Sequence, residues 1–437
     1  MCGNQPCSLR PGGGAWPAHE VARAKYSFPD YIRLYTVAAA RLRCYDVAPM
    51  ADIPLPIALL QQLTPRLPEM LLVLRAYVVT ESPSLEKASV DRCCAVIAKP
   101  WRTLSGGRID RITQKHRGNH LRITWSPAKT RPTGQLLVLG HYDTVYASGT
   151  LRKMPFRISG GKAYGPGAFD MKAGIVQALF AILTLQRLPA ADQPRKRIVF
   201  LWTSDEEIGS ESSRKLIETE ARRSDAVFVL EPSYGPRGAL KTERKGVGEA
   251  ELVAHGRSSH AGLAPQDGIN AIHEIARQIT RLEGWNDLRR GVTISAGIIE
   301  GGTRTNVIPE IARVQLDLRA TTVAEMRQLE RRLRALRPEL KGSRLEISGG
   351  FSRAPLERKM SAELFARAKS LAAEMNLKLE ECAVGGGSDG NYTAAAGIPT
   401  LDGLGAVGDG AHSAHEHIIT KTMPQRAALL AALLQSV

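Results

Sequence analysis

The sequence predicts an α/β protein in which a mixed, mostly parallel sheet is flanked by helices and a smaller two-layer α+β domain is inserted. Two observations carry this prediction. From about residue 55, short apolar runs alternate with amphipathic helical segments, which is the pattern of repeated strand–helix–strand units. Between residues 243 and 350, the order of strand-like and helix-like segments changes to that of a small α+β unit.

The chain is expected to divide into four consecutive parts. Residues 1–50 are rich in Gly, Pro and Arg and have no clear period, so they are predicted to form a poorly ordered extension, with Met50 as an alternative start of the native chain. Residues 51–242 form the first part of the main domain, residues 243–350 the insertion, and residues 351–437 the second part of the main domain.

The main domain contains three apolar runs that are typical of buried strands: QLLVLG, IVFLWTS and AVFVL. Each run is followed at once by acidic residues or histidine. In open α/β sheets, ligands bind at the carboxyl ends of the strands, so these polar side chains are expected to meet at one edge.

The insertion is expected to contain both strands and helices of ordinary length. Strands are predicted over 245–256, 291–302 and 306–320, and helices over 269–284 and 322–337.

Composition excludes several classes of protein. A hydrophobic fraction of 43% and a charged fraction of 23% are those of an ordinary globular protein, which excludes disordered and fibrous classes. No stretch reaches the roughly 18–20 uninterrupted apolar residues of a membrane helix, so no membrane partner is expected. The net charge of +16 comes with no nucleic-acid motif, so no nucleic-acid partner is expected either. The arginine-rich segment is interpreted as the solvated face of a helix: Arg327, Arg331, Arg332, Arg334 and Arg337.

The compartment is predicted from the cysteines and the N-terminus. The six cysteines form neither a metal-binding CxxC pair nor a dense disulfide scaffold, which indicates free thiols in a reducing compartment. The N-terminus lacks the features of a secretory signal. A cytoplasmic location is therefore expected, although export is not excluded.

The strand ends supply most of the candidate chemistry. His141 and Asp143 form an HxD pair, in which His141 is a candidate metal ligand and Asp143 its carboxylate partner; a structural histidine at a strand end is the alternative. Glu206 and Glu207 are adjacent, so one carboxylate can bind metal while the other takes a proton. Glu231 repeats this placement after the third run.

Two further candidates lie outside the strand ends. Asp170 follows a glycine-rich turn and precedes an apolar helix, where it is either a helix cap or a carboxylate that bridges two metal ions. His412 lies in a glycine-rich loop four residues before Glu416, and the neighbouring His415 and His417 are alternative ligands. A ligand set of nitrogen and oxygen without thiolate indicates a hard or borderline metal pair.

These motifs resemble those of a known family. They occur in the order GHYDTVYASG, PFRISGGKAYGPGAFDMKAG, TSDEEIGS, LEPS, GRSSHAG, GGTRTNVIP, GGGSDGNY and GAHSAHE. The series, from about residue 80 to the C-terminus, is similar to the co-catalytic zinc metallopeptidase family of glutamate carboxypeptidase, aminoacylase, acetylornithine deacetylase and succinyl-diaminopimelate desuccinylase. Within that family, the segment DTVYASGTLRKMPFRISGGKAYGPG is most similar to the glutamate carboxypeptidase branch.

The resemblance implies a dinuclear metal site. One ion is held by His141, Asp170 and Glu231. The other is held by Asp170, Glu207 and His412, so Asp170 bridges the pair. The cofactors implied are two divalent metal ions, zinc in most members and cobalt or manganese in others.

The resemblance also assigns roles to residues that bind no metal. Glu206 matches the general base, Asp143 the acid behind the first histidine, and His260 the histidine that the inserted lid or dimerisation domain brings to the substrate, which implies a homodimer. On spacing alone, His260 is more typical of a polar strand end. Three further residues match positions that bind the substrate's carboxylate or the reacting carbonyl region: Asn306, Arg319 and Arg353.

The predicted function is that of a metal-dependent exopeptidase or amidohydrolase that cleaves an amide bond next to a free carboxylate. The preferred reaction is release of a C-terminal glutamate from N-acyl or peptidyl substrates, by attack of a metal-bridging water that Glu206 activates. The alternatives are an N-acyl-amino-acid deacylase of the acetylornithine deacetylase, succinyl-diaminopimelate desuccinylase or aminoacylase type, a dipeptidase, and a non-catalytic binding protein.

Overall fold

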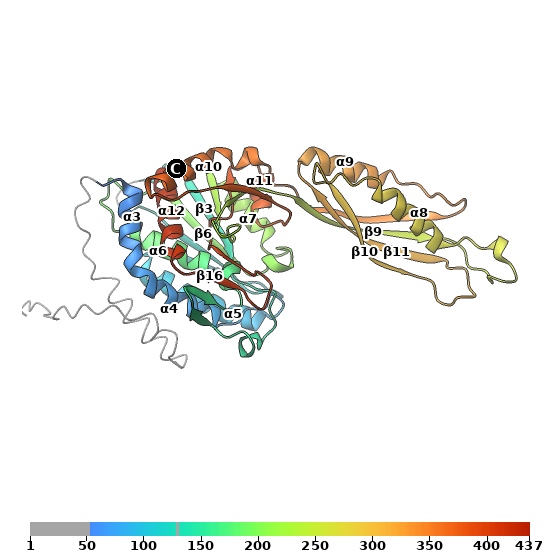
Figure 1. Ribbon diagram of the computed structural model, residues 1–437, viewed down its shortest axis with the longest axis horizontal. Helices are drawn as coiled ribbons and strands as arrows, with labels where there is room; N and C mark the ends of the chain where they lie inside the picture. The colour runs from blue at the N-terminus through green and yellow to red at the C-terminus, as the bar shows by residue number, and fades with distance from the viewer. Residues whose placement is uncertain (1–52, 128–130) are drawn as a thin grey trace, which may run out of the picture.

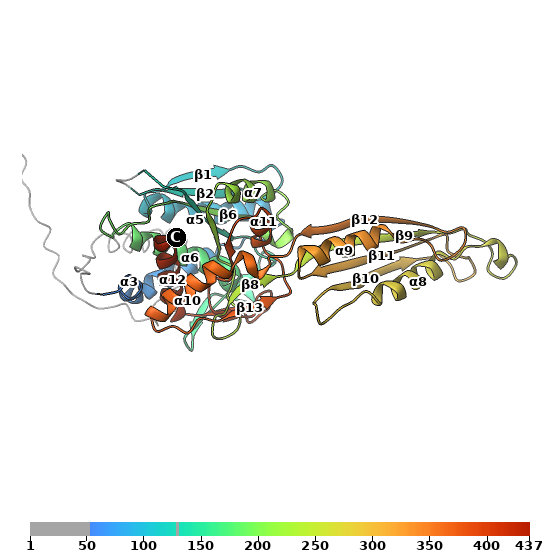
Figure 2. The same cartoon turned by 90° about the horizontal axis from the view of Figure 1, so that it is seen from above.

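The computed structural model describes residues 53–127 and 131–437. It consists of a rounded body and an elongated lid that projects from it (Figure 1, Figure 2). The predicted N-terminal extension, residues 1–50, lies outside the described residues.

The body is built on a six-stranded sheet of order β1-β2-β6-β3-β7-β14. Strands β6, β3, β7 and β14 are parallel to one another, whereas β1 and β2 are antiparallel additions at one edge, so the predicted mixed, mostly parallel sheet is confirmed. The bounds are Arg108–Ile112 (β1), His120–Trp125 (β2), Gln135–His141 (β3), Arg197–Thr203 (β6), Ala226–Val229 (β7) and Thr400–Leu401 (β14).

Apolar residues on both faces of the central strands explain why the sheet is buried. Along β3, Leu136 and Val138 face one hydrophobic cluster, and Leu137 and Leu139 face another, because side chains alternate across a strand. Helices therefore cover both faces. The larger cluster is packed under α3 (Leu55–Leu63), α4 (Leu67–Val78), α5 (Lys87–Leu104), α6 (Ala173–Leu185), α10 (Ala362–Glu374) and α12 (Thr422–Ser436), and the smaller one under α7 (Arg214–Arg222) and α11 (Gly390–Ala395).

One stretch of the described chain, Ala168–Leu185, is helical, long and apolar enough to cross a membrane, with a mean hydropathy of 1.5. It includes α6, and 94% of it is buried inside the protein. Its apolar character is that of a core helix, because residues on all sides of α6 pack against the body.

The lid is a four-stranded antiparallel sheet of order β10-β11-β9-β12, with two helices packed against it. Its bounds are Gly246–His255 (β9), Ala271–Glu283 (α8), Thr293–Gly301 (β10), Ile311–Ala320 (β11), Val323–Arg334 (α9) and Arg344–Arg353 (β12). Alternate residues of β9, such as Leu252, are buried against α8 and α9, which makes the two-layer α+β unit that the sequence predicts. Strand β12 is not among the strands predicted from the sequence.

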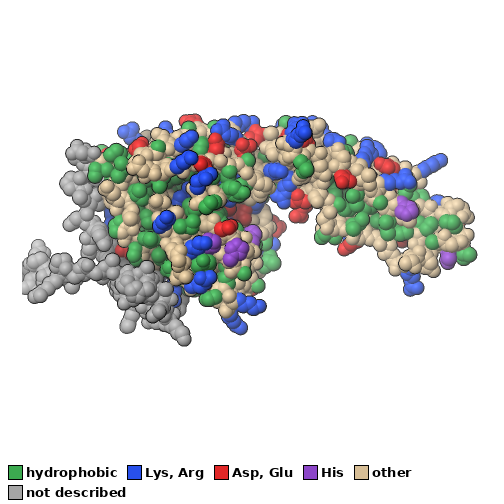
Figure 3. Space-filling model, viewed as in Figure 1, with side chains coloured by type: hydrophobic (Ala, Val, Ile, Leu, Met, Phe, Trp, Pro, Cys, Tyr) green, Lys and Arg blue, Asp and Glu red, His purple; other side chains and the backbone are tan. Residues whose placement is uncertain are grey.

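The arginines predicted to lie on a solvated helix are exposed on or just after α9. Figure 3 shows Lys and Arg side chains spread over both units on the face drawn.

Two small sheets complete the body. One joins β8 (Leu240–Arg244) to β13 (Glu381–Val384). The other has the order β15-β16-β5-β4, and its strands are Gly408–Asp409 (β15), His417–Ile419 (β16), Lys162–Tyr164 (β5) and Arg157–Ser159 (β4). The division into domains stays a prediction; its boundaries at 243 and 350 fall within β8 and β12.

Candidate metal centre

Three neighbouring parallel strands bring the predicted side chains to one sheet edge. His141 is the last residue of β3, Glu206 and Glu207 lie in the single turn after β6, and Glu231 follows β7 by two residues. Since β3 pairs with both β6 and β7 in parallel, all three carboxyl ends point the same way. The polar side chains that follow these strands therefore meet at one edge of the sheet, as predicted.

A fourth segment brings Asp170 to the same edge. Asp170 lies in the turn before α6, and the buried carboxylate of Glu416 accepts hydrogen bonds from the backbone amides of Gly167, Phe169 and Asp170 at 3.0, 2.7 and 3.0 Å. Glu416 precedes β16, which pairs with β5, so this contact joins the turn of Asp170 to the loop that carries His412.

His412 is the histidine of its cluster that reaches the centre. Its Nε2 lies 3.5 Å from Asp170 Oδ2 and 3.1 Å from Glu207 Oε2. The two alternatives have other partners, since His415 Nδ1 lies 2.9 Å from Ser413 Oγ and the His417 ring packs on Tyr164.

The donor atoms fit a pair of divalent cations. His141 Nε2 lies 3.2 Å from Asp170 Oδ1 and 3.6 Å from Glu231 Oε1. These separations, like those of His412, are close to the roughly 3.3 Å between neighbouring ligand atoms of a tetrahedral ion with bonds of about 2.0 Å. Asp170 offers one oxygen to each histidine, which is the arrangement that a bridging carboxylate requires.

By proximity alone, two groups of three residues could each hold a metal ion. The donor atoms of His141, Asp170 and Glu207 lie within 4.8 Å of one another, and so do those of His141, Glu206 and Glu231. Glu206 is therefore near enough to be a ligand. Its Oε1, however, accepts a hydrogen bond from Arg353 Nη1 at 2.9 Å, which holds one carboxylate oxygen on the side of the guanidinium.

Asp143 connects the first histidine to the two glutamates. Its buried carboxylate accepts hydrogen bonds from the backbone amides of Glu206 and Glu207, both at 3.2 Å, and from Ser84 Oγ at 2.8 Å. His141 Nδ1 lies 3.1 Å from the Asp143 backbone carbonyl and 3.4 Å from its carboxylate. Asp143 thus orients the imidazole and the glutamate turn together.

Burial raises the pKa of three carboxyl groups in the centre. The pKa of Glu206, Glu207 and Glu231 each rise to about 7, because taking a carboxylate out of water disfavours its charged form. Arg353 opposes this effect at Glu206, and a hydrogen bond from His412 opposes it at Glu207.

The pKa values of the two histidines also rise, but because of neighbouring carboxylates and not because of burial. Burial lowers the pKa of His141, but hydrogen bonds to Asp143 and Asp170 outweigh it and leave that pKa well above its usual value. Hydrogen bonds to Asp170 and Glu207 raise the pKa of His412 to about 10. The pKa of Asp170 falls in spite of burial, because both imidazoles stabilise its charged form. The centre therefore holds protons that a bound cation would displace.

A buried arginine that was not predicted from the sequence, Arg244, also lies at this centre. Arg244 Nη2 lies 3.5 Å from Glu231 Oε2, and its Nε donates to Asp402 at 2.7 Å. Asp389 and Tyr392, which belong to the segment GGGSDGNY, contact the guanidinium of Arg353. The one signal in the sequence is that Arg244 directly precedes the strand predicted over 245–256.

Two of the predicted site residues lie at the far end of the lid, away from the metal centre of the same chain. His260 and Asn306 are exposed neighbours in the loops beyond β9 and before β11, where the Ala261 amide bonds the Asn306 carbonyl. Strand β9 leads from the body to this end of the lid over ten residues, which is about 33 Å.

Arg319 lies at the other end of the lid sheet. It pairs with Val247 near the body, and its guanidinium forms an ion pair with Asp317 at 2.7 Å.

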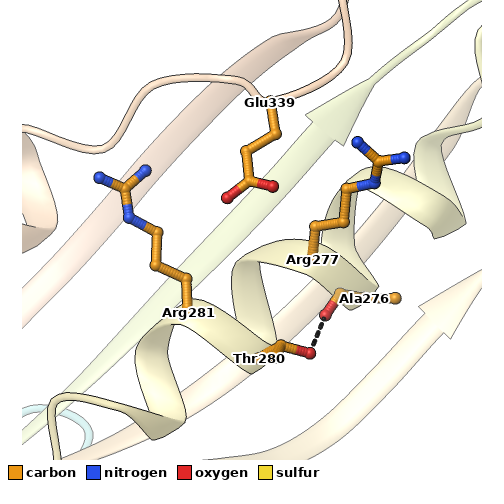
Figure 4. Close-up of a pocket in the computed structure, with 5 residues that line it drawn as sticks. All are labelled: Ala276, Arg277, Thr280, Arg281 and Glu339. Carbon is orange, nitrogen blue, oxygen red and sulfur yellow. Dashed lines mark hydrogen bonds between the residues drawn. The ribbon is translucent and has the colours of Figure 1, made fainter.

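A hollow on the lid contains none of these residues. Figure 4 shows Arg277 and Arg281 of α8 on either side of Glu339, with the Thr280 hydroxyl bonded to the Ala276 carbonyl. It is separate from the candidate metal centre.

Comparisons with known proteins agree with this architecture. The family model of peptidase family M20/M25/M40 matches residues 137–436. Carboxypeptidase G2 from Pseudomonas sp. (strain RS-16) is 31% identical over 314 residues, covering 70% of this chain and 74% of that protein. A succinyl-diaminopimelate desuccinylase from Burkholderia ambifaria is 30% identical over 302 residues, covering 65% and 78%.

Among solved structures, the aminopeptidase PepT from Bacillus cereus has a TM-score of 0.70 and 22% identity. The match covers 85% of this chain and 98% of that one, which shows that the two share a fold.

Proposed function

Because this chain belongs to peptidase family M20/M25/M40 and is a hydrolase of the metallopeptidase type, we propose that it cleaves an amide bond next to a free carboxylate and releases a C-terminal glutamate. The observation that carries this proposal is the grouping of His141, Asp170, Glu207, Glu231 and His412 around an independently held carboxylate, Glu206. The preference for glutamate rests on the glutamate carboxypeptidase-like segment and on the 31% identity to carboxypeptidase G2.

The donor set fits two divalent cations, for which zinc is the proposed identity. When bound, the ions would polarise the scissile carbonyl and lower the pKa of water toward neutrality. Asp170 would bridge them, with His141 and Glu231 on one side and Glu207 and His412 on the other.

Glu206 is proposed as the proton carrier. It accepts a proton from the attacking water and delivers it to the leaving amine, and a pKa raised to about 7 suits both transfers near neutral pH. Its backbone amide is fixed by Asp143 and its Oε1 by Arg353, so the remaining oxygen is the one available to the reaction.

His260 is proposed to act from a second copy of the chain. Its Nδ1 accepts hydrogen bonds from the amides of Gly262 and Leu263, both at 3.1 Å, so the neutral ring carries its proton on Nε2. That donor can stabilise the oxyanion of the substrate. Because β9 separates this loop from the body by about 33 Å, a second copy of the chain in a homodimer would supply the ring more directly than the same chain.

Carboxylate recognition is proposed for Asn306 and Arg319 from the resemblance. Asn306 is exposed beside His260, so it would act from the same lid. The resemblance implies the same role for Arg353, but the contacts of its guanidinium with Glu206 and Asp389 support a different one.

A specific observation favours a second candidate function. The 30% identity to a succinyl-diaminopimelate desuccinylase supports deacylation of an N-acyl amino acid, whose substrate also carries a carboxylate. Both reactions would use the same centre. They differ only in which acyl group and which amino acid the substrate contains.

The test is a substrate panel combined with metal analysis. We expect the purified protein to bind two equivalents of zinc and to release free amino acid fastest from an N-acyl-glutamate, compared with N-acetyl-ornithine, N-succinyl-diaminopimelate and a dipeptide. A chelator should abolish this activity, and added zinc should restore it. Faster cleavage of another substrate would replace the glutamate proposal, whereas a fully metallated protein that cleaves none would support a binding protein.

A further inference from the structure

Two short chain segments connect the lid to the body, and they pair with each other. Arg244, at the end of β8, and Leu356 exchange backbone hydrogen bonds of 3.0 Å in both directions. The buried side-chain amide of Asn391 forms hydrogen bonds with both connecting segments. It donates to the Lys245 carbonyl at 3.1 Å and to the Ala354 carbonyl at 2.7 Å. The hinge is therefore a defined, hydrogen-bonded structure.

Arg353 is the last residue of the lid strand β12, and its side chain enters the body. It pairs with Val247 in the lid sheet, while its guanidinium reaches the turn that follows β6. Only about 10% of this side chain is exposed. One residue thus belongs by its backbone to the lid and by its side chain to the candidate centre.

The guanidinium of Arg353 is bonded within the chain through all three nitrogens. Nε donates to Tyr392 Oη at 3.1 Å, and Nη1 donates to Glu206 Oε1 at 2.9 Å. Nη2 donates to Ser210 Oγ at 2.8 Å and lies 3.5 Å from Asp389 Oδ1. The carboxylates of Glu206 and Asp389 already face its single positive charge.

The same side chains also contact the main chain of the turn that carries Glu206. Arg353 Nη2 also lies 3.4 Å from the Glu206 carbonyl, and the Tyr392 hydroxyl donates to the Gly209 carbonyl at 3.2 Å. The planar guanidinium therefore contacts both the carboxylate and the main chain of one turn, which a flexible ammonium could not reproduce.

We propose that Arg353 is a positioning residue that anchors Oε1 of Glu206 and links the position of this carboxylate to lid strand β12. This inference rests on the proposed role of Glu206 as proton carrier. It differs from the role in binding the substrate's carboxylate that the resemblance implies, because the donors of a free carboxylate-binding arginine would face the substrate. A shift of β12 relative to the body would move the anchor of Glu206.

The kinetic test compares two substrates that differ only in the carboxylate, an N-acyl-glutamate and its α-carboxamide. A positioning residue acts on proton transfer, so Arg353→Ala should lower kcat by the same factor for both, about 10 to 100-fold, with KM changed little. Tyr392→Phe removes a single contact to the guanidinium and should give a smaller loss. Arg319→Ala is the contrast, and it should raise KM for the carboxylate substrate alone.

The structural test needs no activity. Crystal structures of the wild type and Arg353→Ala should show that the Glu206 carboxylate leaves its wild-type position, whereas the histidines keep theirs. Should Arg353→Ala fail to fold because two buried acids lose their partner, Arg353→Met combined with Asp389→Asn allows the same comparison.

The outcomes separate the two proposals. A rise in KM confined to the carboxylate substrate, with kcat intact, would overturn the positioning role, and so would an unmoved Glu206. If the wild type cleaves neither substrate, the proposed function fails, while the position of Glu206 in the two crystal structures still decides the role of Arg353.

Discussion

Replacement of Glu206 by glutamine tests the division between metal ligands and proton carrier most directly. Glutamine has the same shape, and its amide oxygen can still accept the hydrogen bond from Arg353 Nη1 that the Glu206 Oε1 atom accepts at 2.9 Å. The other position then carries an NH₂ group, which cannot take a proton. The substitution therefore removes the base while it keeps the hydrogen bond that positions it.

The expected loss follows from the role. A positioned general base contributes about 10² to 10⁴-fold. At about 1.36 kcal/mol for each factor of ten, this corresponds to a rise of about 2.7–5.4 kcal/mol in the barrier. We expect the upper part of this range, because only 10% of the Glu206 side chain is exposed and because Arg353 and Asp143 hold this residue from two sides.

The assay measures kcat together with bound metal. Glu206→Gln should keep two metal equivalents, whereas the matched variant Glu207→Gln should lose affinity for one ion, because Glu207 Oε2 lies 3.1 Å from His412 Nε2. Glu206 also lies within reach of His141 and Glu231, so metal loss in both variants would make it a ligand. Retention of more than about a tenth of kcat at full metal content would remove it as the base.

Three further predictions concern pH, hydrogen bonding and the core. Zinc affinity should rise steeply with pH from about 6 upward, because the ion must displace protons from its ligands. Glu207 and Glu231 hold these protons below a pKa of about 7, and His412 holds one below a pKa of about 10. A zinc affinity that does not change with pH would contradict this prediction. Asp143→Asn should lower activity by about 10 to 100-fold, since an amide accepts fewer of the three hydrogen bonds that the carboxylate receives, and steady-state kinetics at saturating zinc would detect it. Phe200→Ala should reduce the free energy of unfolding in urea by about 3–5 kcal/mol, because the ring is fully buried; a loss below 1 kcal/mol would mean that the core closes over the cavity.

Much of the fold follows from local patterns in the sequence. The central residues of β3, β6 and β7 are apolar at successive positions because both sheet faces are covered. Polar residues bound each of these runs, so the type and the limits of the strands can be predicted from the sequence. Strand β12 was missed because its residues are mostly exposed or half-buried and include two adjacent glycines, which weaken the apolar alternation of a strand.

The contacts of the centre depend on chain segments that are distant in sequence. Which histidine reaches Asp170 is decided by the pairing of β16 with β5 and by the bonds of Glu416 to the turn of Asp170. The neighbours His415 and His417 have the same chemistry, so spacing alone could not separate them from His412. Similarly, nothing near Arg353 in the sequence indicates that its guanidinium lies against Glu206.

The sequence by itself determined the kind of protein: an α/β metallohydrolase whose acids and histidines follow the strands of a parallel sheet. It could do so because strand periodicity is local, and because the residue types that bind metal are few. Only the tertiary structure decided which of these side chains touch, that Glu206 is held by an arginine from the lid, and that His260 lies on a lid end remote from its own centre. These are consequences of strand pairing and burial between distant segments, which no local pattern specifies.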